Sequence, residues 1–441
     1  MRHIHWRVFG LAWPMILSNL SQPLLGLVDT AILGHLESTD YLAAVAVGSA
    51  ILMSIYLSFG FLRMGTTGLV AQSVGRGQLT EAWRTGMRAI ILGAGLGALL
   101  LMCSPLISSL GTRIMGAGGE IQVLAASYTS IRLYSAPAAL AIYALIGWFI
   151  GKQDTRAPLM ILVTTNLLNV LLDLLLIIGL GMNSDGAALA TVIAEYSGLT
   201  LAGFLVLRKI RQEGQKLIFD GILARKPYWQ LLRINRHLFV RTLALLFSFA
   251  FFTAQGARLG PDIVAANAIL INLVMLTAHG LDGFAHAVEA LVGEAVGASN
   301  RTAFNEAVAS CTLWSVICAL LFTGCFGTGI SWIPILFTDH QSILHLLAEY
   351  WPWLVVLPLI TVGSYLLDGI YVGAIRTAAM QNSMLVSVVL VYLPIWWLFR
   401  DWSNHGLWLA FIALNLARTI TLGAHYILNN RDWIEVPEKL R

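Results

Sequence analysis

The stretch LVAQSVGRGQLT, residues 69–80, returns later in the chain as LVGEAVGASNRT, residues 291–302, about 222 positions further on. Three further matches occur at nearly the same offset: DYLAAVAV (40–47) with DIVAANAI (262–269), GWFIGKQDTRA (147–157) with GIYVGAIRTAA (369–379), and GAALA (186–190) with GLWLA (406–410). All four matching segments occur in the same order in the two halves. Four ordered matches predict that the chain contains an internal duplication.

The composition around this repeat is that of a membrane protein. Of 441 residues, 58% are hydrophobic and 11% are charged, whereas soluble domains carry about 25% charged residues. The net charge of +4 is small, and the basic residues lie in connecting segments, so nucleic-acid binding is not expected.

Apolar runs long enough to cross a hydrocarbon core of ~30 Å recur along the whole chain. They predict an all-α polytopic protein with twelve transmembrane helices. The predicted spans are 8–34, 41–74, 84–109, 121–149, 156–180, 185–207, 236–258, 263–294, 303–328, 342–367, 377–399 and 405–428.

The distribution of Lys and Arg predicts the orientation of these spans. One side holds roughly twenty basic residues and the other about three, so both termini and the polar segment after residue 207 are expected in the cytoplasm. Six spans in each half make the two repeats parallel. We predict an N-terminal lobe (1–207), a cytoplasmic linker (208–235), a C-terminal lobe (236–428) and a cytoplasmic tail (429–441).

Two parallel lobes joined by a linker favour a transporter with its substrate path between the repeats, over a channel or a receptor-like bundle. The four cysteines form no CxxC motif, which argues against a disulfide framework or a zinc site. No GxxxxGK[ST] phosphate loop is present, so no cofactor is expected. Active transport would therefore need an ion gradient and an ionisable group inside the membrane.

Three polar residues of the N-terminal lobe are the best candidates for coupling transport to a proton or cation. Asp29 lies in the first span, and Asn169 and Asp173 are four residues apart, hence on one face of the fifth span. Counting the helical rise places both acids in the outer half of the bilayer. The repeat offset carries all three onto apolar residues, which indicates a role confined to this lobe. An interfacial Asp29, beyond the end of a shorter span, is the alternative.

The first span carries a polar stripe and two prolines. Asn19, Gln22 and Gly26 share the helix face of Asp29 and are expected to line a cavity, together with Asn166 of the fifth span. Pro14 and Pro23 each remove a backbone hydrogen bond and are predicted bending points.

Further ionisable residues lie inside predicted spans. His279, Asp282, His286 and Glu289 follow helical spacing in the eighth span, which favours a cavity lining over a metal site. Arg132, Glu195 and Arg418 are also intramembrane, and the sequence assigns them no role.

Asp368 and Arg376, eight residues apart, form either an inner-gate ion pair or exposed surface. Arg63 is also a candidate for the inner gate. It either extends its side chain toward the membrane surface or pairs with an acid such as Glu289.

The chain resembles the multidrug and toxic compound extrusion (MATE) transporters, and within them the DinF branch. The motifs that carry the resemblance are WPMILSNLSQPLLGLVDTAILGHL (13–36), FLRMGTTGLVAQSVGRG (61–77), LDGFAHAVEALVGEAVGA (281–298) and LLDGIYVGAIRTAAMQNSM (366–384).

The resemblance implies two six-helix lobes in a V shape and export of organic, often cationic compounds in exchange for protons or sodium ions. It implies protonation of Asp29 beside Asn169 and Asp173, and bending of the first helix at Pro14. The same three residues could hold Na⁺. Asp368 fits an acid of the NorM-type sodium site, but 236–258 lacks the second acid that this site requires.

We therefore predict a secondary active multidrug exporter, proton-coupled, and not an enzyme. It is expected to act as a monomer in the bacterial inner membrane, with drug-like substrates and membrane lipid as its partners. A sodium-coupled exporter, a flippase for lipid-linked precursors or polysaccharides, a passive channel and a membrane enzyme using the eighth-span residues are the alternatives.

Overall fold

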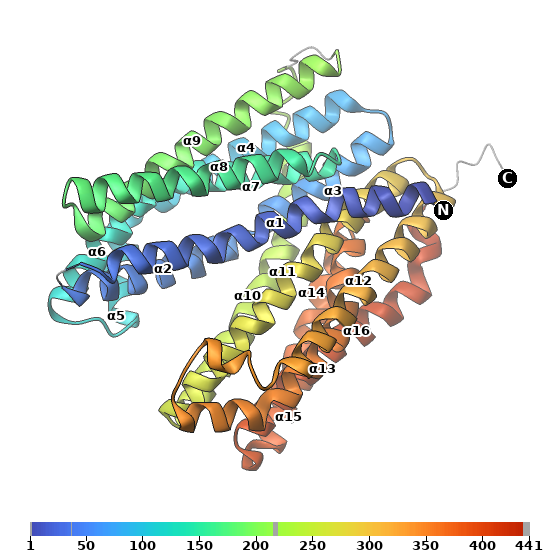
Figure 1. Ribbon diagram of the computed structural model, residues 1–441. Helices are drawn as coiled ribbons and strands as arrows, with labels where there is room; N and C mark the ends of the chain where they lie inside the picture. The colour runs from blue at the N-terminus through green and yellow to red at the C-terminus, as the bar shows by residue number, and fades with distance from the viewer. Residues whose placement is uncertain (1, 37, 215–218, 435–441) are drawn as a thin grey trace. The chain divides into compact units, whose positions relative to one another are not determined.

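The structure is a computed structural model that describes residues 2–36, 38–214 and 219–434. Within these ranges the chain forms helices and no strands, which confirms the all-α prediction (Figure 1). The side chains of Arg2, Gln22 and Leu24 lie outside the described part. The four cysteines are free.

The described chain divides into two compact units. The first unit consists of Met1–Ile16, Ala71–Gly77 and Arg233–Arg441, and the second of Leu17–Val70 and Gln78–Leu232. The first helix therefore contributes to both units, and its dividing point lies two residues after Pro14. The lobe boundaries predicted from the sequence stay a prediction.

Among the described residues, the N-terminal half of the chain contains nine α-helices and one π-helical turn. They are α1 (Arg2–Leu33), α2 (Thr39–Ser58), α3 (Phe61–Gly75), α4 (Leu79–Met102), α5 (Ser104–Ile114), α6 (Gly119–Leu133), α7 (Ala136–Gly151), α8 (Arg156–Asp173), the π-helical η1 (Leu174–Gly179) and α9 (Asn183–Gln212).

The C-terminal half supplies the remaining helices. They are α10 (Arg225–Arg258), α11 (Pro261–Gly297), α12 (Arg301–Gly329), η2 (Pro334–Leu336), α13 (Gln341–Gly373), α14 (Thr377–Val386), the π-helical η3 (Ser387–Tyr392), α15 (Leu393–Leu398), η4 (Arg400–Trp402), α16 (Asn404–Asn429) and η5 (Asn430–Trp433).

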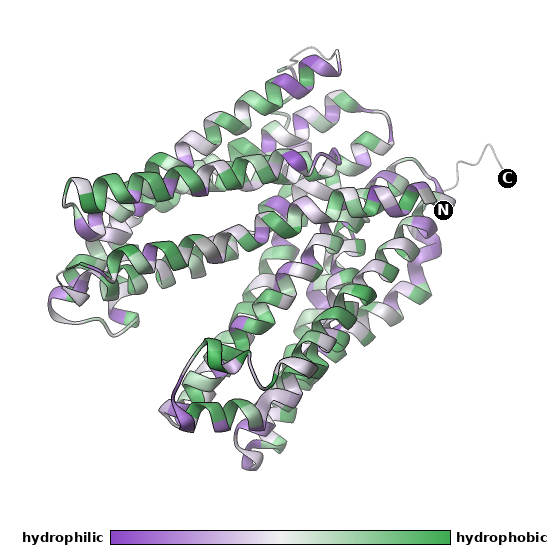
Figure 2. Cartoon of the chain, viewed as in Figure 1, coloured by the Kyte–Doolittle hydropathy of each residue, from purple (hydrophilic) through white to green (hydrophobic). Residues whose placement is uncertain are grey.

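Among the described residues, eleven helices are long and apolar enough to span a membrane, or up to twelve if one bent pair counts as a single span. This pair is α6 and α7, which meet at 51° where one predicted span had been placed. Pro137, in the first turn of α7, explains the break, because proline cannot continue the hydrogen bonding of α6. Hydrophobic residues recur along all the long helices, with hydrophilic residues between them (Figure 2).

Several boundaries differ from the sequence prediction. The predicted span 41–74 is divided into α2 and α3. The third span ends at Met102, and a separate helix, α5, follows with Pro105 in its first turn. Proline is well suited to a first helical turn because its missing N–H is not needed there. The polar linker is also partly helical, since α9 continues to Gln212 and α10 begins at Arg225.

The second unit depends on close contact between α4 and α7. A Cβ atom added at Gly97 would lie 2.4 Å from the carbonyl oxygen of Ala136, and one at Gly93 would lie 2.6 Å from that of Leu140. Small residues let membrane helices approach in this way. The expectation that glycines within residues 93–100 serve helix packing is confirmed for these two, whereas Gly95 faces open space.

We expect Gly97→Ala to destabilise the protein by about 1–3 kcal/mol, because the new methyl group must displace the backbone of α7. The matched control is Gly95→Ala, two residues away on the same helix, which should leave stability unchanged or slightly raised. The apparent Tm of the purified protein in detergent reports the difference. Equal melting of the two variants would contradict the proposed role of the contact.

Candidate functional site

The second unit brings together two carboxyl groups from distant parts of the sequence. Asp29 on α1 and Asp173 at the end of α8 lie close enough for their carboxyl groups to interact electrostatically. Asp173 is only 1% exposed. Both of its carboxyl oxygens and Oδ1 of Asp29 are buried and have no hydrogen-bond donor among the described residues. Asp29 and Asp173 were predicted to lie at similar depths in the membrane, and in the structure they lie close together.

Asn169 completes this group of oxygens. It is 1% exposed, one helical turn before Asp173, and its amide nitrogen donates to Oγ1 of Thr191 on α9 at 3.2 Å. Its own Oδ1, like Oγ1 of Thr165 one turn earlier, is buried without a described partner. Sequence reasoning did not include Thr165, although its position four residues before Asn169 places it on the same face.

A second contact ties α8 to α1. The amide nitrogen of Asn166 donates to Oγ of Ser21 at 2.9 Å. Asn166, predicted as a cavity-lining residue, thus helps to hold α1 against α8 near the acids. Ser21 carried no signal in the sequence beyond its place in the polar stretch.

The backbone changes its hydrogen bonding directly after Asp173. The α-helix ends there and continues as the π-helical turn η1, in which the N–H of Leu180 reaches the carbonyl of Leu175. Single π-helical turns within helices are frequent at functional sites. Periodicity of the sequence could not locate this turn, because the whole segment is uniformly apolar.

One basic residue, Arg132, links this cluster to a further acid. Arg132 interacts electrostatically with both Asp29 and Asp173, and also with Glu195 on α9. One guanidinium nitrogen of Arg132 donates to Oγ of Ser135 at 3.0 Å. Arg132 and Glu195 are intramembrane charges to which the sequence had assigned no role.

The arrangement has a defined chemical consequence. Ionised carboxylates and amide oxygens accept hydrogen bonds and cannot donate them. Two facing carboxylates in a buried site repel each other unless a proton or another cation neutralises one of them. The cluster of Asp29, Asn169 and Asp173 is thus suited to take up H⁺ or a hard cation with oxygen ligands.

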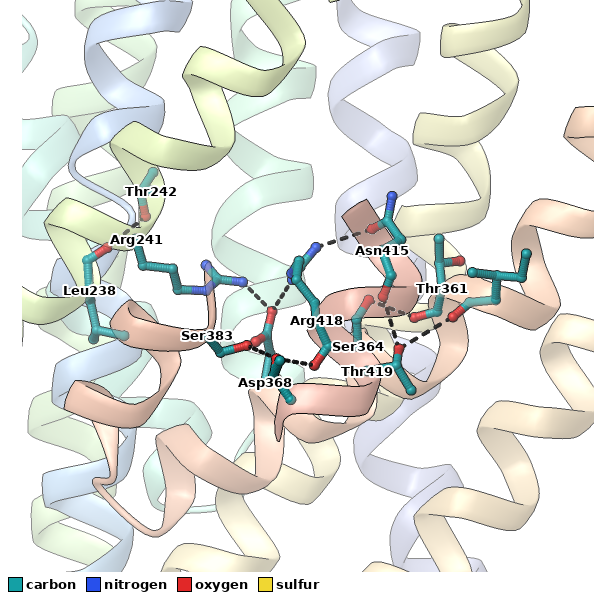
Figure 3. A network of polar contacts seen from close by, with 12 residues as sticks. Leu238, Arg241, Thr242, Thr361, Ser364, Asp368, Ser383, Asn415, Arg418 and Thr419 are labelled. Carbon is teal, nitrogen blue, oxygen red and sulfur yellow. Dashed lines mark hydrogen bonds and ion pairs between the residues drawn. The ribbon is translucent and has the colours of Figure 1, made fainter. Parts of the chain in front are cut away.

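The first unit contains a different ionic cluster. Nη2 of Arg418 on α16 donates to Oδ2 of Asp368 on α13 at 2.6 Å, and Arg241 on α10 donates to the same oxygen. Figure 3 shows the two guanidinium groups meeting at this carboxylate, with Arg418 also reaching Asn415. All three charged residues are buried, with exposures of 4–7%.

This cluster corrects both readings of Asp368. Among the described residues, its ion-pair partners are Arg241 and Arg418, and the pair with Arg376 predicted for an inner gate is not formed. The alternative reading, surface exposure of both residues, is also wrong for Asp368, which is buried, whereas Arg376 is exposed at the start of α14. The seventh predicted span contains no acid. Its helix instead carries a basic residue, Arg241, which pairs with Asp368.

The residues singled out in the eighth span lie on α11. Nδ1 of His286 approaches Oε1 of Glu289 at 3.6 Å, and both residues are buried. His279 and Asp282 are half-buried. Across the described ranges, no group of three or more His, Cys, Asp or Glu residues is arranged to hold a metal ion.

The remaining predicted residues lie on α1 and α3. Asn19 is half-buried, Gly26 is exposed, and the side chain of Gln22 lies outside the described residues. The helix α1 runs without interruption through Pro14 and Pro23. Arg63 is half-buried on α3.

These features define a polytopic helical membrane protein built from two repeats, with buried ionisable groups inside its spans. The sequence profile of the MatE family matches the chain twice, at residues 14–175 and 238–398, which confirms the internal duplication. The chain belongs to this family of multidrug and toxic compound extrusion transporters.

A relative from Escherichia coli, DNA damage-inducible protein F, is 42% identical over 436 residues, which cover 97% of this chain and 92% of the relative. This similarity confirms the predicted DinF branch. The family consists of transporters, which supports a function other than catalysis.

Solved structures share the fold at lower sequence identity. A Vibrio cholerae MATE transporter, VcmN in the bent form, matches with a TM-score of 0.87 at 21% identity, over 98% of each chain. A MOP superfamily transporter from Pyrococcus furiosus matches with a TM-score of 0.89 at 20% identity, over 98% of this chain and 97% of the other. That protein is described as having a binding pocket of reverse polarity that suggests a different function.

Replacing Asp368 by Asn should lower the free energy of unfolding by about 3–5 kcal/mol, because two buried guanidinium groups lose their counter-charge. The apparent Tm in detergent measures the loss. The control Asp401→Asn removes a carboxylate that is 91% exposed and should change stability by less than about 0.5 kcal/mol. If Asp368→Asn melted like the wild type, the ionic cluster would have no structural role.

Proposed function

We propose that this chain is a secondary active exporter that couples the outward movement of organic, often cationic and lipophilic compounds to inward movement of protons. The observation that carries the proposal is the close pair of carboxyl groups of buried Asp173 and half-buried Asp29, three of whose four oxygens are buried without a donor among the described residues. Their position inside spans of a MatE-family chain supports a role of the pair in coupling.

The proposed cycle depends on the charge of Asp29. A proton that enters from outside neutralises Asp29, removes the repulsion between the two acids and lets their carboxyl groups share a hydrogen bond. The first helix then bends at Pro14 or Pro23, and the bound compound is released outward. Loss of the proton to the cytoplasm restores a negative charge that attracts the next cationic substrate.

Three further assignments complete the proposal. The protein acts as a monomer in the bacterial inner membrane, with both termini and the linker in the cytoplasm. Residues 1–207 and 236–428 form the two lobes of the alternating-access cycle. The substrates are drug-like small molecules, and membrane lipid surrounds the spans.

We favour protons over sodium ions because Asp368, the acid on α13, is already neutralised by arginine side chains of the protein. Asp368 accepts from Arg241 and Arg418, so two guanidinium groups occupy the surroundings that a sodium ion would need there. The N-terminal group of Asp29, Asn169 and Asp173 has oxygen ligands that also suit Na⁺. Sodium coupling is therefore tested alongside proton coupling.

The deciding experiment uses proteoliposomes loaded with a fluorescent organic cation and exposed to an imposed pH jump. We expect Asp29→Asn to lower proton-driven exchange at least about tenfold, because a neutral amide cannot bind and release the proton. Asp173→Asn should also impair exchange, since it removes the neighbouring charge that makes neutralisation of Asp29 favourable.

The matched control is Asp185→Asn in the same unit, whose carboxylate already accepts from Ser127 at 2.9 Å. It should transport at the wild-type rate. Normal proton exchange by a correctly folded Asp29→Asn protein would refute the coupling assignment. Exchange driven by a sodium jump at constant pH would instead identify Na⁺ as the coupling ion, and saturable transport of a lipid-linked precursor but no drug would support the flippase alternative.

A second prediction concerns the bending of α1. Pro23→Ala restores a backbone donor inside this helix and should stiffen it, so the turnover rate should fall several-fold while substrate affinity changes little. Turnover and equilibrium binding of the same fluorescent cation separate the two quantities. Pro261→Ala is the control, because Pro261 stands in the first turn of α11 where no donor is required. An unchanged turnover in Pro23→Ala would exclude bending at this proline.

A further inference from the structure

A pocket of 460 Å³ lies in the first unit, at the start of α14. The beginning of α10, the first turn of α14 and the ends of α16 and η5 enclose it. Its lining residues are Arg233, Ile234, His237, Ile375, Arg376, Thr377, Ala378, Ala379, His425, Asn429, Asp432 and Trp433.

The permanent charges in this pocket are mainly positive. Arg233 and Arg376 contribute two guanidinium groups, and Asp432 is the one carboxylate among the lining residues. Neither arginine has an ion-pair partner within the described ranges. Guanidinium groups present paired N–H donors that match the oxygens of a phosphate group.

The two histidines of the pocket are held in place by protein partners. Nδ1 of His237 lies 2.7 Å from Oε1 of Gln381, and Nδ1 of His425 lies 2.8 Å from the hydroxyl of Tyr371. That hydroxyl donates its proton to the carbonyl of Leu422 at 2.8 Å. The two imidazoles therefore form part of the pocket wall, whereas the positive charge of the pocket comes from Arg233 and Arg376.

The backbone adds to the positive potential. Arg376 is the N-cap of α14 and makes no side-chain cap, and Ile375 before it adopts a left-handed φ of 55°. The residues of the first turn of α14, Thr377–Ala379, line the pocket, so the positive end of this helix dipole lies at its wall.

The surroundings of the pocket point to a lipid. Ile427 and Leu428, which directly precede the lining residue Asn429, are 74% and 78% exposed. Apolar side chains of this kind suit contact with acyl chains, and basic pockets at the cytoplasmic ends of membrane helices suit anionic headgroups. We propose that this pocket binds a phosphate group, contributed by an anionic phospholipid such as phosphatidylglycerol.

The test measures thermal shifts of the full-length protein in a neutral detergent, titrated separately with phosphatidylglycerol, phosphatidylcholine and inorganic phosphate. We expect a saturable rise in Tm with phosphatidylglycerol only. The double variant Arg233→Ala/Arg376→Ala should weaken its apparent affinity at least about tenfold, since two charge-assisted contacts are lost.

Two further variants make the result specific. Asp432→Asn removes the opposing carboxylate and should tighten binding, an effect that a purely structural role of the pocket would not produce. Arg236→Ala, an exposed arginine three residues from Arg233 that does not line the pocket, is the matched control and should bind within about twofold of the wild type.

The outcomes separate the two sources of phosphate. A saturable shift with inorganic phosphate that depends on the same two arginines would keep the phosphate site and assign it to a soluble phosphate compound. Indistinguishable shifts with the two lipids and none with phosphate would overturn the proposal. An equal loss in Arg236→Ala, or no gain in Asp432→Asn, would also overturn it.

Discussion

The need to neutralise charge inside a hydrocarbon layer is the constraint on which this structure depends. A lipid environment offers no water to a carboxylate or a guanidinium group, so each buried charge needs a partner from the protein or from the solution. The two halves of the chain meet this requirement differently. The C-terminal half surrounds Asp368 with Arg241 and Arg418, whereas the N-terminal half places Asp29 against a second acid, Asp173.

This difference arises within a duplicated scaffold. Both repeats share the order of their helices and the close helix contacts that small residues allow, yet the polar side chains differ between the repeats. A self-neutralised cluster holds its helices together and requires nothing from solution. Among the described residues, the cluster of acceptors around Asp173 has no such internal counter-charge in direct contact. The two halves of one duplicated scaffold thus differ in how their buried acids are neutralised.

The sequence alone predicted the helical class, the number of spans and the repeat, because apolar runs and basic loops are direct consequences of the membrane. It also predicted the proximity of Asp29 and Asp173, because depth along a helix follows from counting residues. It did not predict that Asp368 would pair with Arg241 and Arg418, since contacts between helices depend on rotations that no spacing reveals. The break before α5 and the start of α10 within the linker were missed because local proline chemistry and short polar helices carry weak periodic signals.

The π-helical turn that follows Asp173 alters the phase of α8. An α-helix advances by about 100° for each residue, so one additional residue within a turn rotates everything beyond it by about that angle. The face shared by Thr165, Asn169 and Asp173 consequently ends at the last acid. Converting this turn to regular α-helix would rotate the C-terminal end of the span relative to the acids. A change in pitch at this single turn would therefore change the direction in which the end of the helix faces, while the acids before the turn keep their positions.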